Sequence, residues 1–121
     1  MFPTEDEGVE AYAWVAQHYG LSFEHSCPAI RAALREAEHL AEDVYESPAA
    51  VLYAFARTPR AFAGHRTMTV LLTHAQVVSS GQRLDAPLAE VAELVRTIAR
   101  RDAAYEDARA FFAEKLFPFA G

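Results

Sequence analysis

The chain has 121 residues, 52% of them hydrophobic and 23% charged, and carries a formal net charge of −6. This size and composition predict one packed domain over residues 1–121 and exclude a disordered chain. The excess of acidic side chains disfavours nucleic acid as a partner, because nonspecific binding of nucleic acid depends on Lys and Arg that neutralise phosphates.

Cysteine usage and hydropathy bear on the compartment. A single cysteine, Cys27, excludes a disulfide within the chain, which fits a reducing compartment. The start of the chain is acidic where a secretory signal would be basic, and no apolar run approaches the roughly 18 residues that a membrane span needs. We therefore expect a cytoplasmic protein that makes no contact with a membrane.

Start and stop signals in the first third of the chain predict two helices. Thr4 and Glu7 have the spacing of a capping box, and apolar residues recur at helical intervals from there to Gly20, which supplies a stop. Ser26 before Pro28 indicates a second start, followed by an apolar stripe opposite charged residues. The second helix is therefore expected to be amphipathic and half exposed.

A third helix is predicted in the most apolar part of the chain. Ser47 and Pro48 repeat the signal of a cap followed by proline, and residues 49–57 are so apolar that this helix should be largely buried. The helix should end before Pro59, because the residue that precedes a proline is disfavoured in the helical region.

Three further helices make the predicted fold all-α, with six helices. Apolar and small residues predict a central helix of about residues 64–80, in which we expect His74 to be a hydrogen-bonded core residue. We expect Asp85 and Asp102 to mark the starts of the last two helices, and Pro118 to end the helical pattern. Short connections between six helices predict a bundle-like or orthogonal domain.

The loop before the central helix contains candidate anion-binding residues. Amide N–H groups at the start of a helix attract anions, and a glycine lets a phosphate approach the main chain closely. Cationic and titratable side chains accompany such a glycine here. The candidates are Arg57, Arg60, Gly64, His65, Arg66 and Thr67. The alternative is an ordinary turn between helices whose arginines are solvated or paired with carboxylates.

The segment YAFARTPRAFAGHRTMTVLLTHAQVVSSGQRLDAPLAEVAELVRTIARR combines a helix, a loop, a long helix, a glycine, a short connection and two more helices. The same order surrounds the motif HxFx(D/E)GN(K/R) in the Fic/Doc (death-on-curing) family, and the chain resembles the Doc-like branch over nearly its whole length. This resemblance implies a compact six-helix Fic/Doc-like domain. It also implies a nucleoside triphosphate as cofactor and transfer of phosphate or AMP to a protein hydroxyl.

The loop departs from the family motif at its two catalytic positions. One register places Thr58 at the family histidine and Phe62 at the metal-binding acid, whereas the other places Pro59 and Ala63 there. None of these side chains can act as a base near neutral pH or hold a hard cation, so no intact catalytic residue and no metal site is predicted. His65 is the only substitute base in the loop.

The resemblance implies a bacterial toxin–antitoxin type protein with an antitoxin or another protein as its partner. Because the catalytic positions are altered, we expect transfer to be impaired, with a nucleoside triphosphate bound near Gly64 to Thr67 if any is bound. The alternative is a non-catalytic protein-interaction module that retains only the fold. Phe117 and Phe119, beyond the last helix, make a homo-oligomer a candidate assembly.

Overall fold

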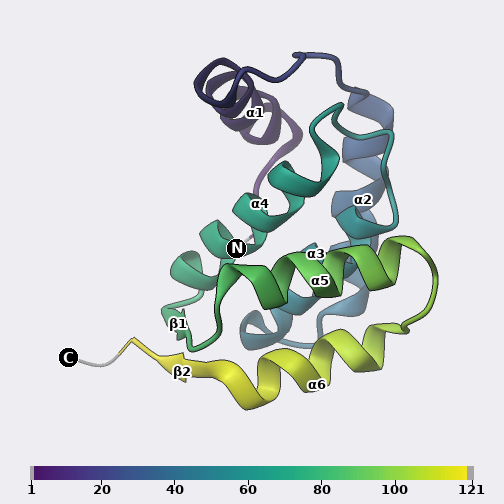
Figure 1. Ribbon diagram of the computed structural model, residues 1–121. Helices are drawn as coiled ribbons and strands as arrows, with labels where there is room; N and C mark the ends of the chain where they lie inside the picture. Colours follow the sequence, from purple (N-terminus) through teal and green to yellow (C-terminus); the bar gives the residue numbers. More distant parts are fainter. Residues whose placement is uncertain (1, 120–121) are drawn as a thin grey trace.

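The computed structural model describes residues 2–119 (Figure 1). Over these residues the chain forms six α-helices, one short 3-10 helix and two short strands. In chain order the elements are α1 (Glu5–Tyr19), α2 (Cys27–Leu40), η1 (Val44–Glu46), α3 (Ser47–Ala56), α4 (His65–Ser79), β1 (Gln82–Leu84), α5 (Leu88–Ala99), α6 (Tyr105–Lys115) and β2 (Leu116–Pro118). The predicted all-α, six-helix architecture is confirmed.

The first two helices begin and end where local signals in the sequence predict. The Thr4 hydroxyl accepts a hydrogen bond from the Glu7 amide and the Glu7 carboxylate accepts one from the Thr4 amide, which is the predicted capping box. Gly20 ends α1 with φ 67°, a left-handed conformation that glycine adopts without strain. Ser26 caps α2 through the Ala29 amide.

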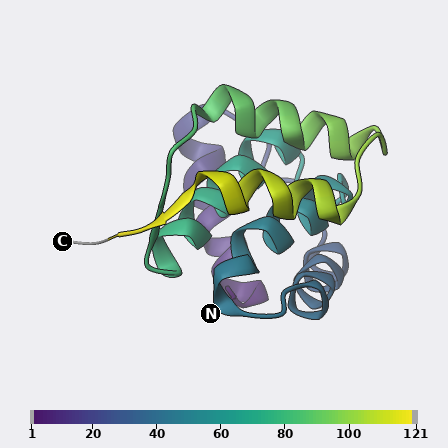
Figure 2. The ribbon, with the colours of Figure 1, turned by 90° about the horizontal axis from the view of Figure 1, so that it is seen from below.

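Helix α3 is enclosed by the rest of the molecule. All of its residues except Tyr53 are buried, and it packs against α2, α4, α5 and α6. Ser47 is the first residue of the helix, and its hydroxyl donates to the Val44 carbonyl oxygen. Helices α5 and α6 run in opposite directions along one side of α3 (Figures 1 and 2). The predicted burial of this helix is confirmed.

Two apolar clusters flank α3. The first joins α1, α2, α3 and α4 and includes Tyr12, Ile30, Phe55 and Phe62. The second joins α3 to α5 and α6 through residues such as Val95. Because α3 contributes to both clusters, the loop that follows it is fixed to the centre of the fold.

The end of the chain forms a small sheet that the sequence analysis did not predict. Strands β1 and β2 pair antiparallel, with Arg83 opposite Phe117, and the Phe119 amide donates to the Gly81 carbonyl oxygen. The prediction that Asp85 caps α5 is wrong, because its amide donates to the Lys115 carbonyl oxygen instead and Pro87 occupies the cap position.

Two other local predictions are also corrected. Asp102 does not cap α6; the cap position is Ala104, whose amide donates to the Asp107 carboxylate at 2.7 Å. His74 is exposed on α4, and the polar residues that α4 buries are Thr69, Thr73 and Gln76. None of the helices between residues 2 and 119 has the length and apolar character that a bilayer crossing requires.

Candidate functional site

The loop predicted to bind an anion begins with a tight turn. The Thr58 hydroxyl donates to the Ala54 carbonyl oxygen at 2.8 Å, and the Ala61 amide donates to the Thr58 carbonyl oxygen at 3.1 Å. Pro59 and Arg60 are exposed on this turn. The two candidates for the family histidine position, Thr58 and Pro59, are therefore turn residues without a titratable side chain.

The two candidates for the acid position have different environments. Phe62 is 1% exposed, and its ring centre lies 4.8 Å from that of Tyr12 and 5.9 Å from that of Phe55. Ala63 is exposed, and its amide donates to the Glu24 carbonyl oxygen at 2.8 Å. Neither residue supplies an oxygen ligand from its side chain. Among residues 2–119, no three His, Cys, Asp or Glu side chains are grouped so that they could hold a metal ion.

The connection between α1 and α2 lies across this loop. The Ser26 amide donates to the Ala61 carbonyl oxygen at 3.0 Å, and His25 and Phe62 form an isolated antiparallel β-bridge. Backbone groups that would otherwise face solvent or a ligand are thus paired with residues 24–26.

Gly64 is where the loop approaches a neighbouring segment most closely. Its amide donates to the Tyr12 hydroxyl oxygen at 2.7 Å, and that hydroxyl donates to the Ser22 carbonyl oxygen at 2.6 Å. A Cβ atom added at Gly64 would lie 2.6 Å from Cδ1 of Leu21. The space that a glycine was predicted to open for a phosphate is therefore filled by Leu21 and Tyr12.

The ring of His65 is fixed by the end of α3. Its Nε2 lies 2.7 Å from the Phe55 carbonyl oxygen, which can only accept, so Nε2 carries the proton. Only Nδ1 is left for proton transfer in a neutral ring. The His65 ring is thus oriented by a backbone carbonyl oxygen, and not by the carboxylate or hydroxyl that would support it as a substitute base.

Arg66 and Thr67 line a groove beside α4. The groove has a volume of about 390 Å³, and its remaining walls come from the end of α1 and from α4 and α5. Those walls are formed by Tyr19, Val70, Leu71, Leu88, Ala89, Ala92 and Arg96. Most of the groove's surface is apolar, and two of its lining residues, Arg66 and Arg96, are cationic.

Arg57 lines a different cavity, of about 690 Å³, between α2, α3 and the start of α6. Its guanidinium lies 5.1 Å from the ring centre of Tyr53 and 3.5 Å from Glu36 Oε1, a contact that is an ion pair without hydrogen-bond geometry. Arg35 and His39 line the same cavity. The predicted cationic residues are therefore divided between two cavities and do not converge on the start of α4.

Comparison of the sequence with models of known protein families gives no match, and comparison with curated proteins gives none either. The resemblance to the Fic/Doc family therefore depends on the order of the elements and on the loop residues alone.

The residues that close the loop could not be predicted from the sequence. Tyr12 fits the apolar stripe of α1, and nothing near it in the sequence indicates that its hydroxyl reaches Gly64. Leu21 follows a helix stop and looks like an ordinary loop residue. The groove had one visible signal in the sequence, the large apolar side chain of Leu88 in the first turn of α5, where acidic residues are favoured by the helix dipole.

Proposed function

We propose that the chain is a Doc-like protein of a toxin–antitoxin type module in which nucleotide-dependent transfer is impaired and the retained activity is the binding of another protein. The impairment is supported by the loop. Thr58 and Pro59 cannot act as a base, Phe62 belongs to the core, and the Gly64 amide is occupied by a hydroxyl of α1. Loss of a positioned general base alone costs about 10²- to 10⁴-fold in rate.

The observation that carries the binding role is the groove beside α4. Tyr19 and Leu88 line it with 53% and 56% of their surfaces exposed, and Val70 and Leu71 form its floor on α4. Contiguous exposed apolar surface on a soluble domain marks an interaction site more often than an accident of packing. Its position between two helices suits an amphipathic helix as the bound element.

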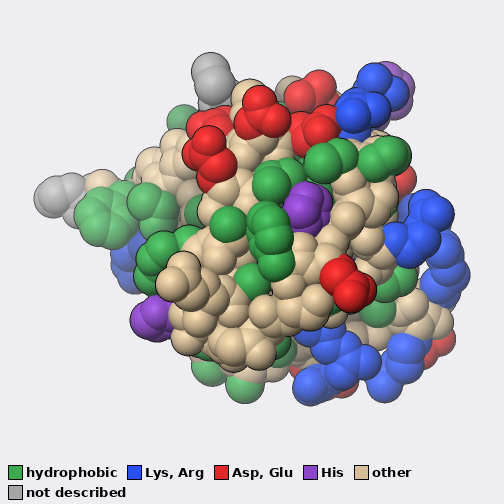
Figure 3. All heavy atoms as spheres, turned by 90° about the horizontal axis from the view of Figure 1, so that it is seen from above, with side chains coloured by type: hydrophobic (Ala, Val, Ile, Leu, Met, Phe, Trp, Pro, Cys, Tyr) green, Lys and Arg blue, Asp and Glu red, His purple; other side chains and the backbone are tan. Residues whose placement is uncertain are grey.

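An aromatic patch extends this surface along α1. Trp14 is exposed and stacks on His18 with ring centres 4.5 Å apart, and His18 contacts Tyr19 edge to face. Figure 3 views the molecule from the α1 side and shows hydrophobic side chains and a histidine near the middle of this face, with acidic side chains along one edge. Large aromatic side chains contribute strongly to binding energy at protein interfaces.

The charges at the groove indicate the chemistry of the partner. Within residues 2–119, Arg66 forms no salt bridge, whereas Arg96 is paired with Glu93. A partner helix with an apolar face and an Asp or Glu at its edge would bury the groove and pair with Arg66. An antitoxin segment of this kind is the proposed partner.

Co-expression with the product of any small antitoxin-like gene that is found beside this one tests the proposal. We expect the two proteins to co-purify, and Leu88→Glu to remove the interaction because it places a charge in the apolar groove. Val78→Glu is the matched control, since Val78 is also exposed but does not line the groove. Loss of binding in both variants, or in neither, would contradict the proposed surface.

A second candidate is retained binding of a nucleoside triphosphate at the start of α4. It is favoured by one observation, that α4 begins at Gly64 without a side-chain cap, which leaves the amides of the first turn for a ligand. Amide resonances of His65, Arg66 and Thr67 in a nitrogen-15 spectrum should then shift on addition of ATP and Mg²⁺. Unchanged resonances would remove this candidate.

A further inference from the structure

Four residues on the outer side of α1 are spaced as in a coiled coil. Glu7, Ala11, Trp14 and His18 follow one another at intervals of four, three and four residues, and all four are exposed. Helix α1 lies at the edge of the fold (Figure 1), and its buried residues occupy other positions of the helix. These four residues, the α1 stripe, can therefore contact a second helix.

The α1 stripe contains one large side chain and one small one in adjacent turns. Trp14 is 60% exposed, and its ring stacks on that of His18 with ring centres 4.5 Å apart. A ring that is already held by its neighbour loses little conformational freedom when a partner covers it. Ala11 has only a methyl group, so a large side chain of a partner helix fits beside it.

The charges of α1 are separated along its length. Its acidic residues all lie in the first half, whereas the second half contains His18 and no carboxylate. The acidic residues are Glu5, Asp6, Glu7 and Glu10. A parallel pair of such helices would place Glu7 beside a second Glu7. An antiparallel pair places the acidic half of each helix beside the half of the other that contains His18, which favours the antiparallel orientation.

One antiparallel register pairs every residue of the α1 stripe. When Ala11 of one copy lies opposite Trp14 of the other, Glu7 lies opposite His18, and the two-fold axis repeats both pairs. A ring then faces a methyl group in two layers, and a carboxylate faces an imidazole N–H group in the other two. At the usual separation of packed helix axes, about 8 to 10 Å, side chains paired in this way are in contact.

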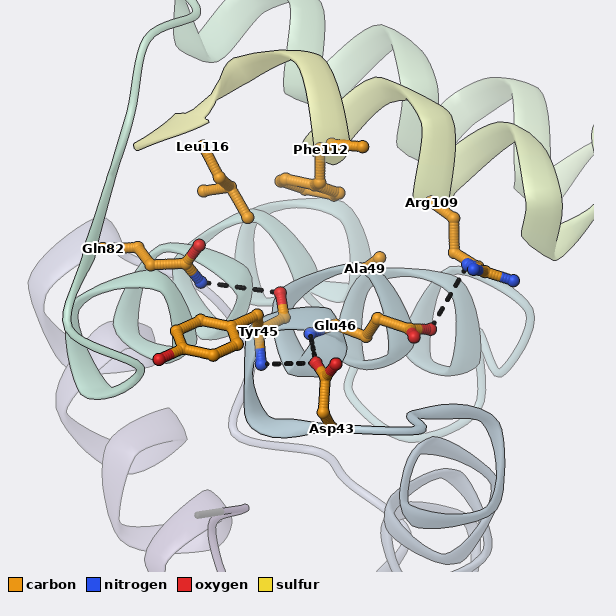
Figure 4. A pocket seen from close by; sticks show the side chains of 9 residues that line it. Asp43, Tyr45, Glu46, Ala49, Gln82, Arg109, Phe112 and Leu116 are labelled. Atoms are coloured by element: carbon orange, nitrogen blue, oxygen red, sulfur yellow. Dashed lines mark hydrogen bonds and ion pairs between the residues drawn. The ribbon is translucent and has the colours of Figure 1, made fainter. Parts of the chain in front are cut away.

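The other exposed aromatic residues, Phe117 and Phe119, lie where β1, β2 and η1 come together. Figure 4 shows the cavity at this end of the molecule, and its charged groups interact within the chain. Asp43 accepts hydrogen bonds from two amides of η1, and Glu46 forms an ion pair with Arg109. This end therefore lacks the charge complementarity toward a second copy that the α1 stripe has.

We propose that the chain forms a homodimer through the α1 stripe, with the two helices antiparallel about a two-fold axis. The α1 stripe shares no residue with the groove beside α4, so this proposal goes beyond the proposed function and does not rest on it. Trp14 and His18 contact the second copy, and Tyr19 remains part of the groove. Four layers bury less than the roughly 800 Å² per partner of a standard interface, so the dimer is weak, with a Kd of about 10 to 500 µM.

Sedimentation equilibrium of the purified protein alone tests the dimer. We expect the average mass to rise from 13.4 kDa toward twice that value as the concentration is raised to about 1 mM. Trp14→Glu should weaken association at least roughly tenfold, because it replaces the central ring by a charge. Phe119→Glu is the matched control, since Phe119 is 72% exposed and lies outside the α1 stripe, and it should leave the Kd unchanged. Leu88→Glu should leave it unchanged as well, so the dimer and the proposed partner are tested separately.

Three results would overturn the dimer. They are a wild-type protein that stays monomeric up to about 1 mM, association that survives Trp14→Glu, and association that Phe119→Glu removes.

An exchange of charges tests the register. Glu7 and His18 are separated by about 16 Å along one helix, so they do not touch within one copy. His18→Glu should weaken the dimer roughly tenfold, because Glu7 of the other copy then faces a like charge. Adding Glu7→Lys should restore the wild-type affinity, since Lys then faces Glu across the interface. A double variant that stays as weak as His18→Glu refutes the antiparallel register.

Discussion

Replacing Tyr12 with Phe removes the one hydroxyl that joins α1 to the loop before α4. The oxygen accepts from the Gly64 amide at 2.7 Å and donates to the Ser22 carbonyl oxygen at 2.6 Å, and the side chain is fully buried. Phe fills nearly the same volume, so the stacking on Phe62 is retained. The variant therefore reports on these hydrogen bonds and not on packing.

The loss of stability in the Tyr12→Phe variant follows from the two hydrogen bonds of the missing hydroxyl. Each hydrogen bond contributes a net stabilisation of about 1 kcal/mol, and an amide left without an acceptor at Gly64 costs about 1 kcal/mol more. We expect the free energy of unfolding to fall by about 3 kcal/mol. For a domain of this size that corresponds to a decrease in Tm of roughly 10 °C.

Urea denaturation followed by circular dichroism measures the change. Tyr53→Phe is the matched control, because Tyr53 is half-buried and its hydroxyl makes no hydrogen bond with residues 2–119. Its loss should change the free energy of unfolding by less than about 0.5 kcal/mol. A Tyr12→Phe variant as stable as this control would refute the structural role assigned to the Gly64 amide.

Gly64→Ala should lower the free energy of unfolding by about 1 kcal/mol, because the new Cβ would lie 2.6 Å from Cδ1 of Leu21 and 3.2 Å from the Tyr12 hydroxyl oxygen. A Leu21→Ala background should remove most of this cost, and the same cost in both backgrounds would contradict the contact with Leu21. Phe62→Asp restores the acid of the family motif in one register, but it places a charge in the core. We expect the free energy of unfolding to fall by more than about 4 kcal/mol, and a stably folded variant would contradict the core position of Phe62. Burial and the Glu5 carboxylate raise the pKa of Cys27, so Glu5→Gln should lower that pKa and move the pH profile of iodoacetamide alkylation to lower pH; an unchanged profile would disagree.

Features set by neighbouring residues could be predicted from the sequence. Thr4 with Glu7, Gly20 and Ser26 each act within three or four residues, and all are used as predicted. The errors at Asp85 and in the last strand have a different origin. Pairing of β1 with β2 joins segments that are more than thirty residues apart, 82–84 and 116–118. Strands of three residues are too short to show a pattern in the sequence that would predict this pairing.

For the candidate site, the sequence predicts only which catalytic groups the loop lacks. The absence of a base and a metal-binding acid is evident from Thr58, Pro59, Phe62 and Ala63 themselves. What Gly64 does instead could not be read from the sequence, since its partners belong to α1 and to the connection that follows.

Which residues of α4 face the core could not be predicted from the local sequence either. His74 was predicted in the core on the strength of its apolar neighbours, yet it is exposed. Gln76, two residues further on, faces the core instead, and its side chain donates to the Ser47 hydroxyl oxygen at 3.0 Å. A choice between two polar residues so close together depends on how α4 is rotated against α3, which is a property of the tertiary packing.

Under the first of the two candidate functions, we propose that the loop before α4 is packed as structure and does not bind a nucleotide. Calorimetric titration of the purified protein with ATP and Mg²⁺ tests it most directly, with Arg66→Ala as the paired variant. We expect no saturable heat up to about 5 mM nucleotide with either protein. Saturable binding by the wild type that Arg66→Ala abolishes would contradict it.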